Sequence, residues 1–430
     1  MAQLFRDVLR TPDAVDLSVD EDFFRLGGDS ILAARLVSLA RRQDLPLTIR
    51  DVFEKRTIGE LAESMTVVAP TAEPIPLVPS STLERLRESG NGVDSWVYTE
   101  VVHAPAQDLD SLRSSFVRLV STTDALRISV TTASRRLWTS EVRPAEAVDP
   151  AGRFVAHPSA LDLDNAAAQA LSMIDVGTGH SAAVVAWADG TGVAFVLAVH
   201  STVADRRSVH RMARCLIGAD DTEAPSSPLA PALDAIENDG QELDADHVEA
   251  WVVASERPTT HNDSMWASDV RIDFEIDLDL DGDVEAVIDG ALREVTSGGS
   301  ENLRVDLEVD MLTGDTAAGI PVGPFTATWP SRARLAAADV DPREFPLLRF
   351  HNRTGRRALR RMEHSDVLVT RTYGLVASGE REGVEDEYRC VVRYRIESTS
   401  VAVTVIGMSD EAVAELRDAL SSSLDRAPVC

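Results

Sequence analysis

Residues 23–36, Phe23-Phe24-Arg25-Leu26-Gly27-Gly28-Asp29-Ser30-Ile31-Leu32-Ala33-Ala34-Arg35-Leu36, determine the structure of the first part of the chain. A glycine pair interrupts the stretch, and apolar residues at helical spacing follow it. Asp29 and Ser30 stand at the expected start of this helix, and both residue types are preferred helix caps. The pattern predicts a turn followed by a helix, in which Ser30 is either a simple cap or a residue with a chemical role.

The six residues from Leu26 to Ile31 (LGGDSI) resemble the core motif of peptidyl carrier proteins, the thiolation domains of nonribosomal peptide synthetases. The resemblance covers residues 3–66 and includes the approach to the motif and two later helices, at residues 20–24, 52–54 and 57–62. It implies a small all-α carrier domain of four helices over residues 1–68.

In that family a phosphopantetheinyl transferase attaches a 4′-phosphopantetheine arm to the motif serine. The resemblance therefore implies that Ser30 is the attachment residue, that 4′-phosphopantetheine is the cofactor, and that the arm carries a thioester-bound peptide. The neighbouring residues that match the carrier motif are Gly27, Gly28 and Asp29.

The composition limits the kinds of partner. The chain has 430 residues, enough for two or three domains, with 42 Lys and Arg against 71 Asp and Glu and a formal net charge of −29. Such a surface repels nucleic acid and anionic membranes, and it either maintains solubility or favours a partner with basic patches. Six arginines nevertheless lie close together and form either a solvated helix face or a basic surface: Arg349, Arg353, Arg356, Arg357, Arg360 and Arg361.

Targeting and metal-binding signals are weak throughout the sequence. No apolar run reaches the roughly 20 residues of a membrane span, and we expect no signal sequence. The three cysteines, Cys215, Cys390 and Cys430, predict neither a disulfide framework nor a metal site. They are typical of a reducing compartment, so we expect a cytoplasmic protein without a dedicated metal site.

Four prolines between Thr66 and Pro79 predict a linker over residues 69–79, with the domain boundary near residue 70. Beyond it, strand and helix patterns alternate in two halves, at about residues 80–220 and 240–430. The acidic stretch Gly218–Gln241 is expected to be a loop between the halves. The main predictions are strands at 96–103, 126–130, 182–187, 193–200, 270–278, 303–309, 391–396 and 401–406, and helices at 109–123, 209–217, 284–296 and 410–424.

Residues 76–426 resemble the condensation/epimerisation superfamily of the same synthetases. Three motifs carry the resemblance: Ile75–Ser80 (IPLVPS), Thr123–Arg127 (TDALR) and Val322–Thr326 (VGPFT). The first lacks the glutamine that usually follows it, and Thr123 replaces a histidine. The resemblance implies an α+β domain of two chloramphenicol-acetyltransferase-like lobes arranged as a V, with a tunnel between them.

The chemistry of this superfamily centres on H-H-x-x-x-D-G, which here reads His200-Ser201-Thr202-Val203-Ala204-Asp205-Arg206. The first histidine and the aspartate remain as His200 and Asp205, and we expect both to be buried structural residues. Ser201 replaces the second histidine, which the family uses for acid/base work or for steering an amine, and a hydroxyl does not titrate near neutral pH. Arg206 replaces the glycine and either pairs with Asp205 or blocks the tunnel. We therefore expect neither condensation nor epimerisation at this site.

Glu308 aligns with the glutamate of the E-G-H-G-R-E motif of epimerisation domains, in which a histidine and a glutamate exchange the Cα proton from opposite sides. The rest of the motif has diverged in residues 309–311. Glu308 is therefore either a leftover strand carboxylate or a residual acid/base. The GGDSI form of the carrier motif also resembles carriers that precede epimerisation domains.

Two subtypes of this superfamily have lost the active-site motif and serve as docking platforms. X-domains of glycopeptide-antibiotic synthetases recruit cytochrome P-450 type oxygenases to the peptide on the adjacent carrier, and interface domains recruit β-hydroxylases. X-domains keep the first histidine and the aspartate, which is the pattern found here. The resemblance thus implies a carrier joined to a non-catalytic recruitment platform, within a larger synthetase whose neighbouring domains supply the peptide. The alternatives are a divergent carrier–epimerisation didomain, which converts an L-aminoacyl residue to D with Glu308 as sole base and water as the second proton carrier, and a structural spacer.

Overall fold

The computed structural model describes most of the chain. The described residues are 2–9, 18–19, 21–42, 52–53, 55–64, 74–105, 107–134, 137–219, 228–255, 265–277, 284–297, 303, 305–312, 322–331, 341–360, 365–377 and 382–424. Residues 69–73 of the predicted linker lie outside them.

The first domain is a small helical unit around an apolar core. Its helices are α1 (Ala2–Leu9), α2 (Ser30–Arg42) and α4 (Ile58–Ser64), and residues 52–53 and 55 are also helical. The described residues of this domain thus contain three helices with defined bounds, and the four helices expected for the carrier domain remain a prediction. The largest fully buried side chains of this core are Leu4, Phe5, Phe23, Leu36 and Leu61.

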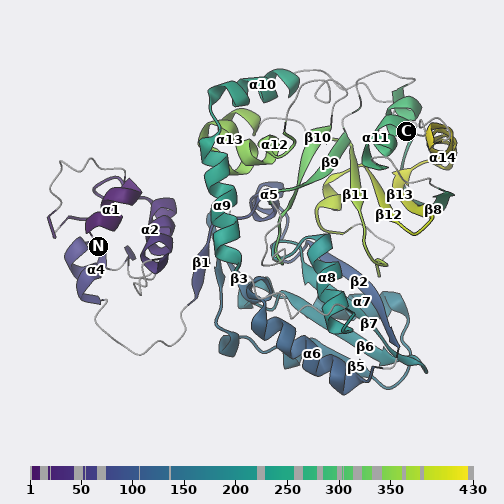
Figure 1. The fold of residues 1–430 in the computed structure, drawn as a ribbon, viewed down its shortest axis with the longest axis horizontal. Helices are drawn as coiled ribbons and strands as arrows, with labels where there is room; N and C mark the ends of the chain where they lie inside the picture. Colours follow the sequence, from purple (N-terminus) through teal and green to yellow (C-terminus); the bar gives the residue numbers. More distant parts are fainter. Residues whose placement is uncertain are drawn as a thin grey trace.

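A four-stranded sheet forms one lobe of the larger domain, in the order β2-β7-β6-β5 (Figure 1). Strand residues alternate between two apolar clusters, because Val184 and Phe195 face one side while Val185 and Val196 face the other. Helices cover both faces, as expected for a sheet buried on two sides. The elements are β2 (Val97–Pro105), α6 (Leu109–Thr122), β5 (Phe154–His157), α7 (Leu163–Ser172), β6 (Ala182–Ala188), β7 (Gly192–His200) and α8 (Arg206–Leu216).

A six-stranded sheet forms the second lobe, in the order β10-β9-β11-β12-β13-β8. Strand β11 runs parallel to both β9 and β12, and the other pairs are antiparallel. The apolar sides of α11 and α14 share a core with this sheet. The elements are β8 (Trp266–Asp277), α11 (Val284–Ser297), β9 (Val305–Asp310), β10 (Thr326–Ser331), β11 (Val367–Arg371), β12 (Cys390–Ile396), β13 (Ser400–Met408) and α14 (Asp410–Leu424).

A small third sheet marks the start of the larger domain. Strand β1 (Ile75–Leu77) pairs antiparallel with β4 (Leu137–Val142), which also pairs with β3 (Ile128–Ser134). Ile75–Leu77 therefore belongs to this domain, and the prediction of a linker as far as residue 79 is wrong at its end. The opening motif that resembles the condensation superfamily is thus partly a strand.

The predicted loop at Gly218–Gln241 is also wrong in its second half, where α9 (Leu229–Glu242) forms. Leu229, Leu233 and Ile236 lie on one side of α9 and enter the core of the first lobe. Pro231 stands in the first turn, where a helix tolerates proline, and this residue obscured the helical pattern. Four further helices accompany α9: α5 (Ser81–Ser89), α10 (Ala245–Ser255), α12 (Glu344–Pro346) and α13 (Arg353–Leu359), the last preceded by the π-helix η6 (Leu347–His351).

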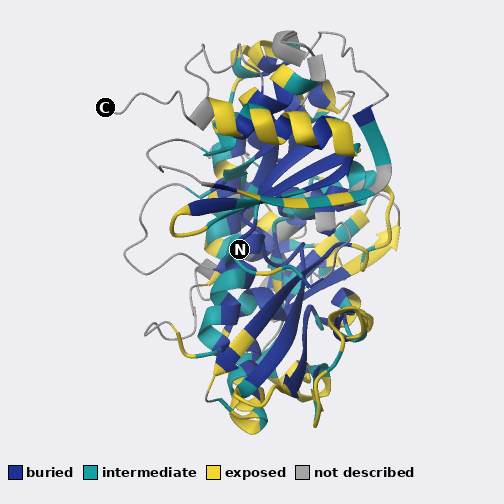
Figure 2. Ribbon diagram, turned by 90° about the vertical axis from the view of Figure 1, so that its right-hand side faces the viewer, coloured by how far each residue is buried: buried dark blue, intermediate teal, exposed yellow. Residues whose placement is uncertain are grey.

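The two lobes are connected by more than the covalent chain. Between β11 and β12 the chain leaves its own sheet, and the Val101 amide of β2 donates a hydrogen bond of 2.7 Å to the Leu375 carbonyl. Figure 2 shows most strand residues of the two sheets as buried and the outer sides of the covering helices as exposed. In the part of the chain that the structure describes, no helix is both long enough and apolar enough to cross a membrane.

Candidate functional site

The carrier motif forms an exposed turn at the start of α2. The Asp29 carboxylate accepts a 2.8 Å hydrogen bond from the Leu32 amide, so Asp29 is the cap of the helix and Ser30 is its first residue. Gly27 has a backbone φ of +97°, a conformation that favours glycine. A Cβ on Gly28 would come within 2.6 Å of the Phe23 ring and carbonyl oxygen. Both glycines are therefore required by the local geometry.

Aromatic packing fixes this turn on the domain. Phe23 is fully buried, and its ring lies edge to face with Phe5 at 5.1 Å and with Phe24 at 5.4 Å. The Phe23 amide also donates to the Arg56 carbonyl at 2.8 Å. A serine that begins a helix after an exposed, anchored turn fits a residue that must be reached by a modifying enzyme. The local structure thus fits the attachment of a phosphopantetheine arm.

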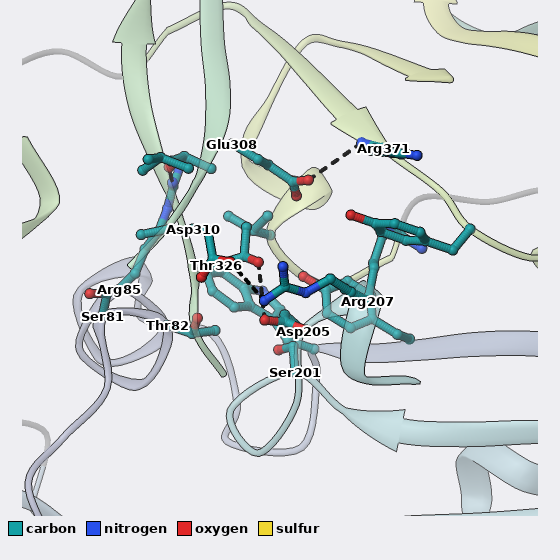
Figure 3. A pocket seen from close by; sticks show the side chains of 18 of the residues that line it. Ser81, Thr82, Arg85, Ser201, Asp205, Arg207, Glu308, Asp310, Thr326 and Arg371 are labelled. Carbon is teal, nitrogen blue, oxygen red and sulfur yellow. Dashed lines mark hydrogen bonds and ion pairs between the residues drawn. The ribbon is translucent and has the colours of Figure 1, made fainter. Parts of the chain in front are cut away.

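The second candidate site is a cavity of about 190 Å³ between the two lobes. Side chains from α5, β2, α8, β9, β10 and β11 form its wall, and Figure 3 shows that Glu308 and Asp205 approach it from opposite sides. We call it the central cavity. It contains Ser201, Asp205, Arg206 and Glu308 of the predicted site, whereas His200 is not part of its wall.

His200 is fully buried behind the cavity wall. Its Nε2 lies 2.6 Å from the Val93 carbonyl and its Nδ1 lies 2.7 Å from the Thr202 hydroxyl. Burial lowers the pKa of His200 to about 4, although the bond to Val93 opposes this shift. The imidazole is therefore neutral at pH 7, with Nε2 as donor and Nδ1 as acceptor.

Asp205 caps α8 and ties it to the VGPFT motif. Its carboxylate accepts hydrogen bonds from the Ser208 amide at 2.7 Å, the Phe325 amide at 3.2 Å and the Thr326 hydroxyl at 3.1 Å. Burial raises the pKa of Asp205, while the bonds from Ser208 lower it. Asp205 and His200 thus each have their own structural partners, and no hydrogen bond between the two is recorded in the described part of the chain.

Ser201 occupies the place of the missing second histidine without replacing its chemistry. The side chain is 1% exposed, and among the described residues its hydroxyl has no hydrogen-bond partner. In the part of the chain that the structure describes, no base lies within hydrogen-bond reach to activate this hydroxyl. The loss of titratable chemistry at this position stays a prediction.

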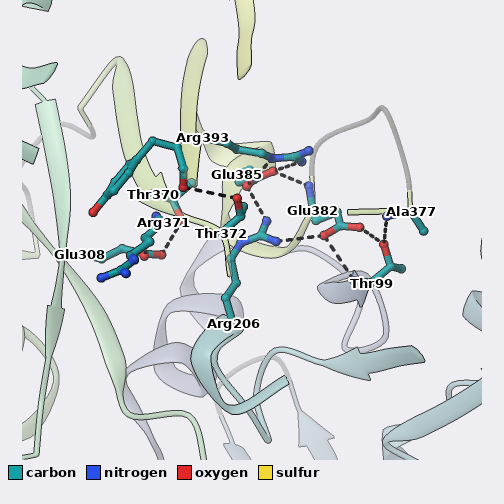
Figure 4. Close-up of polar contacts among 11 residues, drawn as sticks. Thr99, Arg206, Glu308, Thr370, Arg371, Thr372, Ala377, Glu382, Glu385 and Arg393 are labelled. Carbon is teal, nitrogen blue, oxygen red and sulfur yellow. Dashed lines mark hydrogen bonds and ion pairs between the residues drawn. The ribbon is translucent and has the colours of Figure 1, made fainter. Parts of the chain in front are cut away.

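Arg206 crosses from the first lobe into a buried acidic pair of the second (Figure 4). Its guanidinium lies 3.2 Å from Glu382 and 2.5 Å from Glu385, and it stacks over the Tyr98 ring at 4.5 Å. Burial alone would lower the pKa of Arg206, but Glu385 and Glu382 raise it above its ordinary value. The suggested pairing with Asp205 is wrong, because the capped Asp205 carboxylate is bound elsewhere.

Sequence reasoning missed the acceptors of this arginine. Glu385 also binds Arg393 with 3.0 Å between Arg393 Nε and the carboxylate, and the Thr99 hydroxyl donates to Glu382. We call Arg206, Glu382, Glu385 and Arg393 the interlobe ion cluster. The only signal in the sequence was that a buried arginine needs a counter-charge, and that signal does not identify which of 71 acidic residues supplies it.

Glu308 brings a carboxyl group from β9 of the second lobe to the cavity wall. The Thr370 hydroxyl donates to its carboxylate at 2.8 Å, and the Arg371 amide does so at 3.4 Å. Burial raises the pKa of Glu308 to about 7, although Arg206 and the bond from Thr370 oppose the shift. Among the described residues, no group of His, Cys, Asp or Glu side chains is placed to hold a metal ion.

Comparisons with known proteins identify the first domain. Residues 1–65 match the family model of the phosphopantetheine attachment site. The nonribosomal peptide synthetase nanA of Aspergillus nanangensis is 54% identical over 54 residues, which are 13% of this chain and 2% of that protein. The synthetase benY of Aspergillus terreus is 35% identical over 127 residues, 27% of this chain and 11% of that protein. The chain thus matches only a small part of these curated relatives.

Solved structures match the larger domain. The epimerization domain from the third module of tyrocidine synthetase B gives a TM-score of 0.64 at 13% identity, covering 83% of this chain and 98% of that one. The X-domain from teicoplanin biosynthesis gives 0.53 at 13% identity, covering 84% and 97%. Its complex with OxyB gives 0.51 at 14% identity, covering 84% and 95%. At these identities the similarity concerns the fold alone. Residues 1–65 therefore form a phosphopantetheine attachment domain similar to those of nonribosomal peptide synthetases, which implies a 4′-phosphopantetheine group, and the larger domain has the fold of an epimerization domain and an X-domain.

Proposed function

We propose that the chain carries a thioester-bound peptide on phosphopantetheine at Ser30 and that its larger domain recruits a tailoring oxygenase of the cytochrome P-450 type without catalysis of its own. A phosphopantetheinyl transferase supplies the arm, and neighbouring synthetase domains supply the peptide. The fold shared with an X-domain that forms a complex with OxyB supports this choice of partner.

The observation that carries the proposal is the state of the central cavity. Arg206 stands where the superfamily motif has glycine, and ion pairs to Glu382 and Glu385 hold its guanidinium in place. Ser201 stands where the motif has its working histidine, and no described residue provides an activating base for its hydroxyl. A domain that keeps its fold while its reaction centre is filled in this way has the features of a docking platform.

A divergent epimerisation domain is the second candidate, because Glu308 titrates near neutral pH at the cavity wall. The structural similarity to an epimerization domain supports the same candidate. Exchange of a Cα proton from two sides, however, requires a second acid/base opposite Glu308. Asp205 lies on that side, but three hydrogen bonds already engage its carboxylate.

One loaded protein separates the two candidates. Ser30 would be loaded with a peptidyl-pantetheine, and the binding of OxyB and other P-450 oxygenases would be measured with the whole chain and after deletion of residues 76–430. The same loaded protein would be followed for deuterium exchange at the peptide Cα. The proposal expects binding that the deletion abolishes and no exchange above that of the carrier alone. Exchange above that level would refute it and establish the epimerase.

The attachment residue has its own control. Ser30→Ala is expected to abolish the mass increase produced by the transferase, whereas Ser38→Ala, the same substitution later in helix α2, leaves it unchanged. If the transferase still loaded the Ser30→Ala variant, the attachment residue would have to be a residue other than Ser30.

A further inference from the structure

Helix α13 and its C-cap residue present three arginines to solvent in a chain with a formal charge of −29. Arg353, Arg357 and Arg360 are exposed, and within the described residues no ion pair is recorded for any of them. We call these three side chains the α13 basic surface. An isolated patch of positive charge on an otherwise acidic molecule attracts anionic groups.

Other residues hold α13 in place, so the outer arginines are not needed for its packing. Arg349 lies 2.9 Å from Glu88 of α5, and Leu348 and Leu359 are fully buried. Gly355 packs so closely that a Cβ there would lie 2.5 Å from the Leu348 carbonyl oxygen. Substitution of the exposed arginines is therefore expected to leave the helix folded.

The carrier domain supplies an anionic group at Ser30. Residues 1–66 contain 9 basic and 12 acidic side chains, so the carrier has a net charge of −3 and the remainder of the chain −26. The two domains therefore repel each other on average. Asp29 is exposed beside Ser30, and the phosphodiester of a phosphopantetheine arm adds a further negative charge at that point. Arginine pairs well with phosphate and carboxylate groups because its planar donors match their geometry.

The point at which the chain enters the larger domain places the carrier domain near the α13 basic surface. Strand β1, which begins the larger domain, and η6, which leads into α13, both pack along α9 (Figure 1). Helix α9 has 14 residues, a length of about 21 Å. Residues 65–73, between the carrier and the larger domain, span at most roughly 30 Å. A tethered contact of this kind needs little intrinsic affinity, because a short linker gives an effective concentration of about 1 mM.

We propose that the α13 basic surface binds the anionic Ser30 end of the modified carrier domain, through ion pairs with Asp29 and the phosphodiester of the arm. The contact goes beyond the proposed recruitment of an oxygenase and does not depend on it. It places the carrier at one side of the larger domain between successive encounters with other proteins.

A nitroxide analogue of pantetheine, loaded onto Ser30 of the full chain, tests the contact. The readout is the paramagnetic relaxation enhancement at the methyl group of Ala358, which is exposed between Arg357 and Arg360. We expect a strong enhancement at about 0.1 M salt that weakens at about 1 M, where the Debye length falls from ~10 to ~3 Å. In the double variant Arg357→Glu/Arg360→Glu, the relaxation enhancement at Ala358 is expected to be about fivefold or more smaller than in the unsubstituted protein.

A matched variant controls for total charge. Arg118→Glu/Arg417→Glu changes the net charge by the same amount at exposed positions on α6 and α14 and is expected to keep the enhancement. No enhancement in the unsubstituted protein, an unchanged value in the Arg357/Arg360 variant, or an equal loss in the control would each refute the proposal. Should the charge reversal unfold α13, Arg357→Gln/Arg360→Gln gives the same test without reversed charge. No oxygenase is present, so the result is independent of the recruitment experiment.

Discussion

Arg206 stands at the position of the glycine in the superfamily motif. Its buried, positively charged side chain occupies space that a glycine would leave empty. Removing two charges from water costs several kcal/mol per ion unless both are well paired. The interlobe ion cluster meets this requirement, because the 1%-exposed Glu385 side chain binds both Arg206 and Arg393. The cluster makes the substitution at Arg206 compatible with folding.

Glu385→Gln is accordingly expected to lower the free energy of unfolding by about 3–5 kcal/mol, because two buried guanidinium groups lose their shared counter-charge. Urea denaturation measures the change. Glu397→Gln removes a charge from the more exposed pair with Arg395 and serves as the control, with an expected loss below about 1 kcal/mol. Equal losses in both variants would mean that the cluster contributes no more than a surface pair.

Glu308 should make stability depend on pH. Its pKa is about 7 in the folded protein against an ordinary 4.5, so the folded state binds the proton more tightly than the unfolded state. The free energy of unfolding should therefore fall as the pH rises from about 4.5 to about 7, with no further contribution above that range. Glu308→Gln should reduce this fall in urea denaturation curves recorded at pH 5 and pH 8. An identical pH dependence in the variant would assign the fall to other groups.

At the scale of elements, the turn before α2 depends on the absence of a side chain at Gly28. A methyl group there would overlap the Phe23 ring and carbonyl oxygen. Gly28→Ala should destabilise the carrier domain by about 1–3 kcal/mol, as overpacked sites do. Thermal unfolding would measure this, and mass spectrometry would follow slower loading of Ser30. Gly92→Ala, which meets no atom within 4 Å, should change neither property.

Elements with a strong local pattern were predictable from the sequence. Helix α14 has the predicted bounds of residues 410–424, and β6 and β7 lie at the predicted strands 182–187 and 193–200. The two strands pair antiparallel, and Gly190 in the turn between them has a φ of +88°. Helix α9 was missed because Pro231 and its acidic neighbours obscured the apolar spacing at Leu229, Leu233 and Ile236. Local periodicity carries no information about which distant residues meet. The pairing of Arg206 with Glu382 and Glu385 therefore could not be predicted from the sequence. The replacement of motif residues by Ser201 and Arg206 could be read from the sequence directly.

For the whole molecule, segments that follow the first lobe in sequence complete that lobe's core and sheet. Helix α9 follows the first lobe in sequence, and its apolar side enters that lobe's core. The segment between β11 and β12 contributes Leu375 to a backbone pair with Val101 of the opposite sheet. The interlobe ion cluster adds a third link. The larger domain should therefore unfold in one transition, detected alike by tryptophan fluorescence and circular dichroism.

The position of α9 has a practical consequence for a chain cut between residues 220 and 227. The downstream fragment would retain α9 and the Leu375 segment, both of which complete the upstream fragment's core and sheet. The two pieces should behave as a split protein: they should elute together in size-exclusion chromatography and reassemble when they are expressed from separate genes. Separation of the pieces without denaturant would mean that the covalent connection itself holds the lobes together.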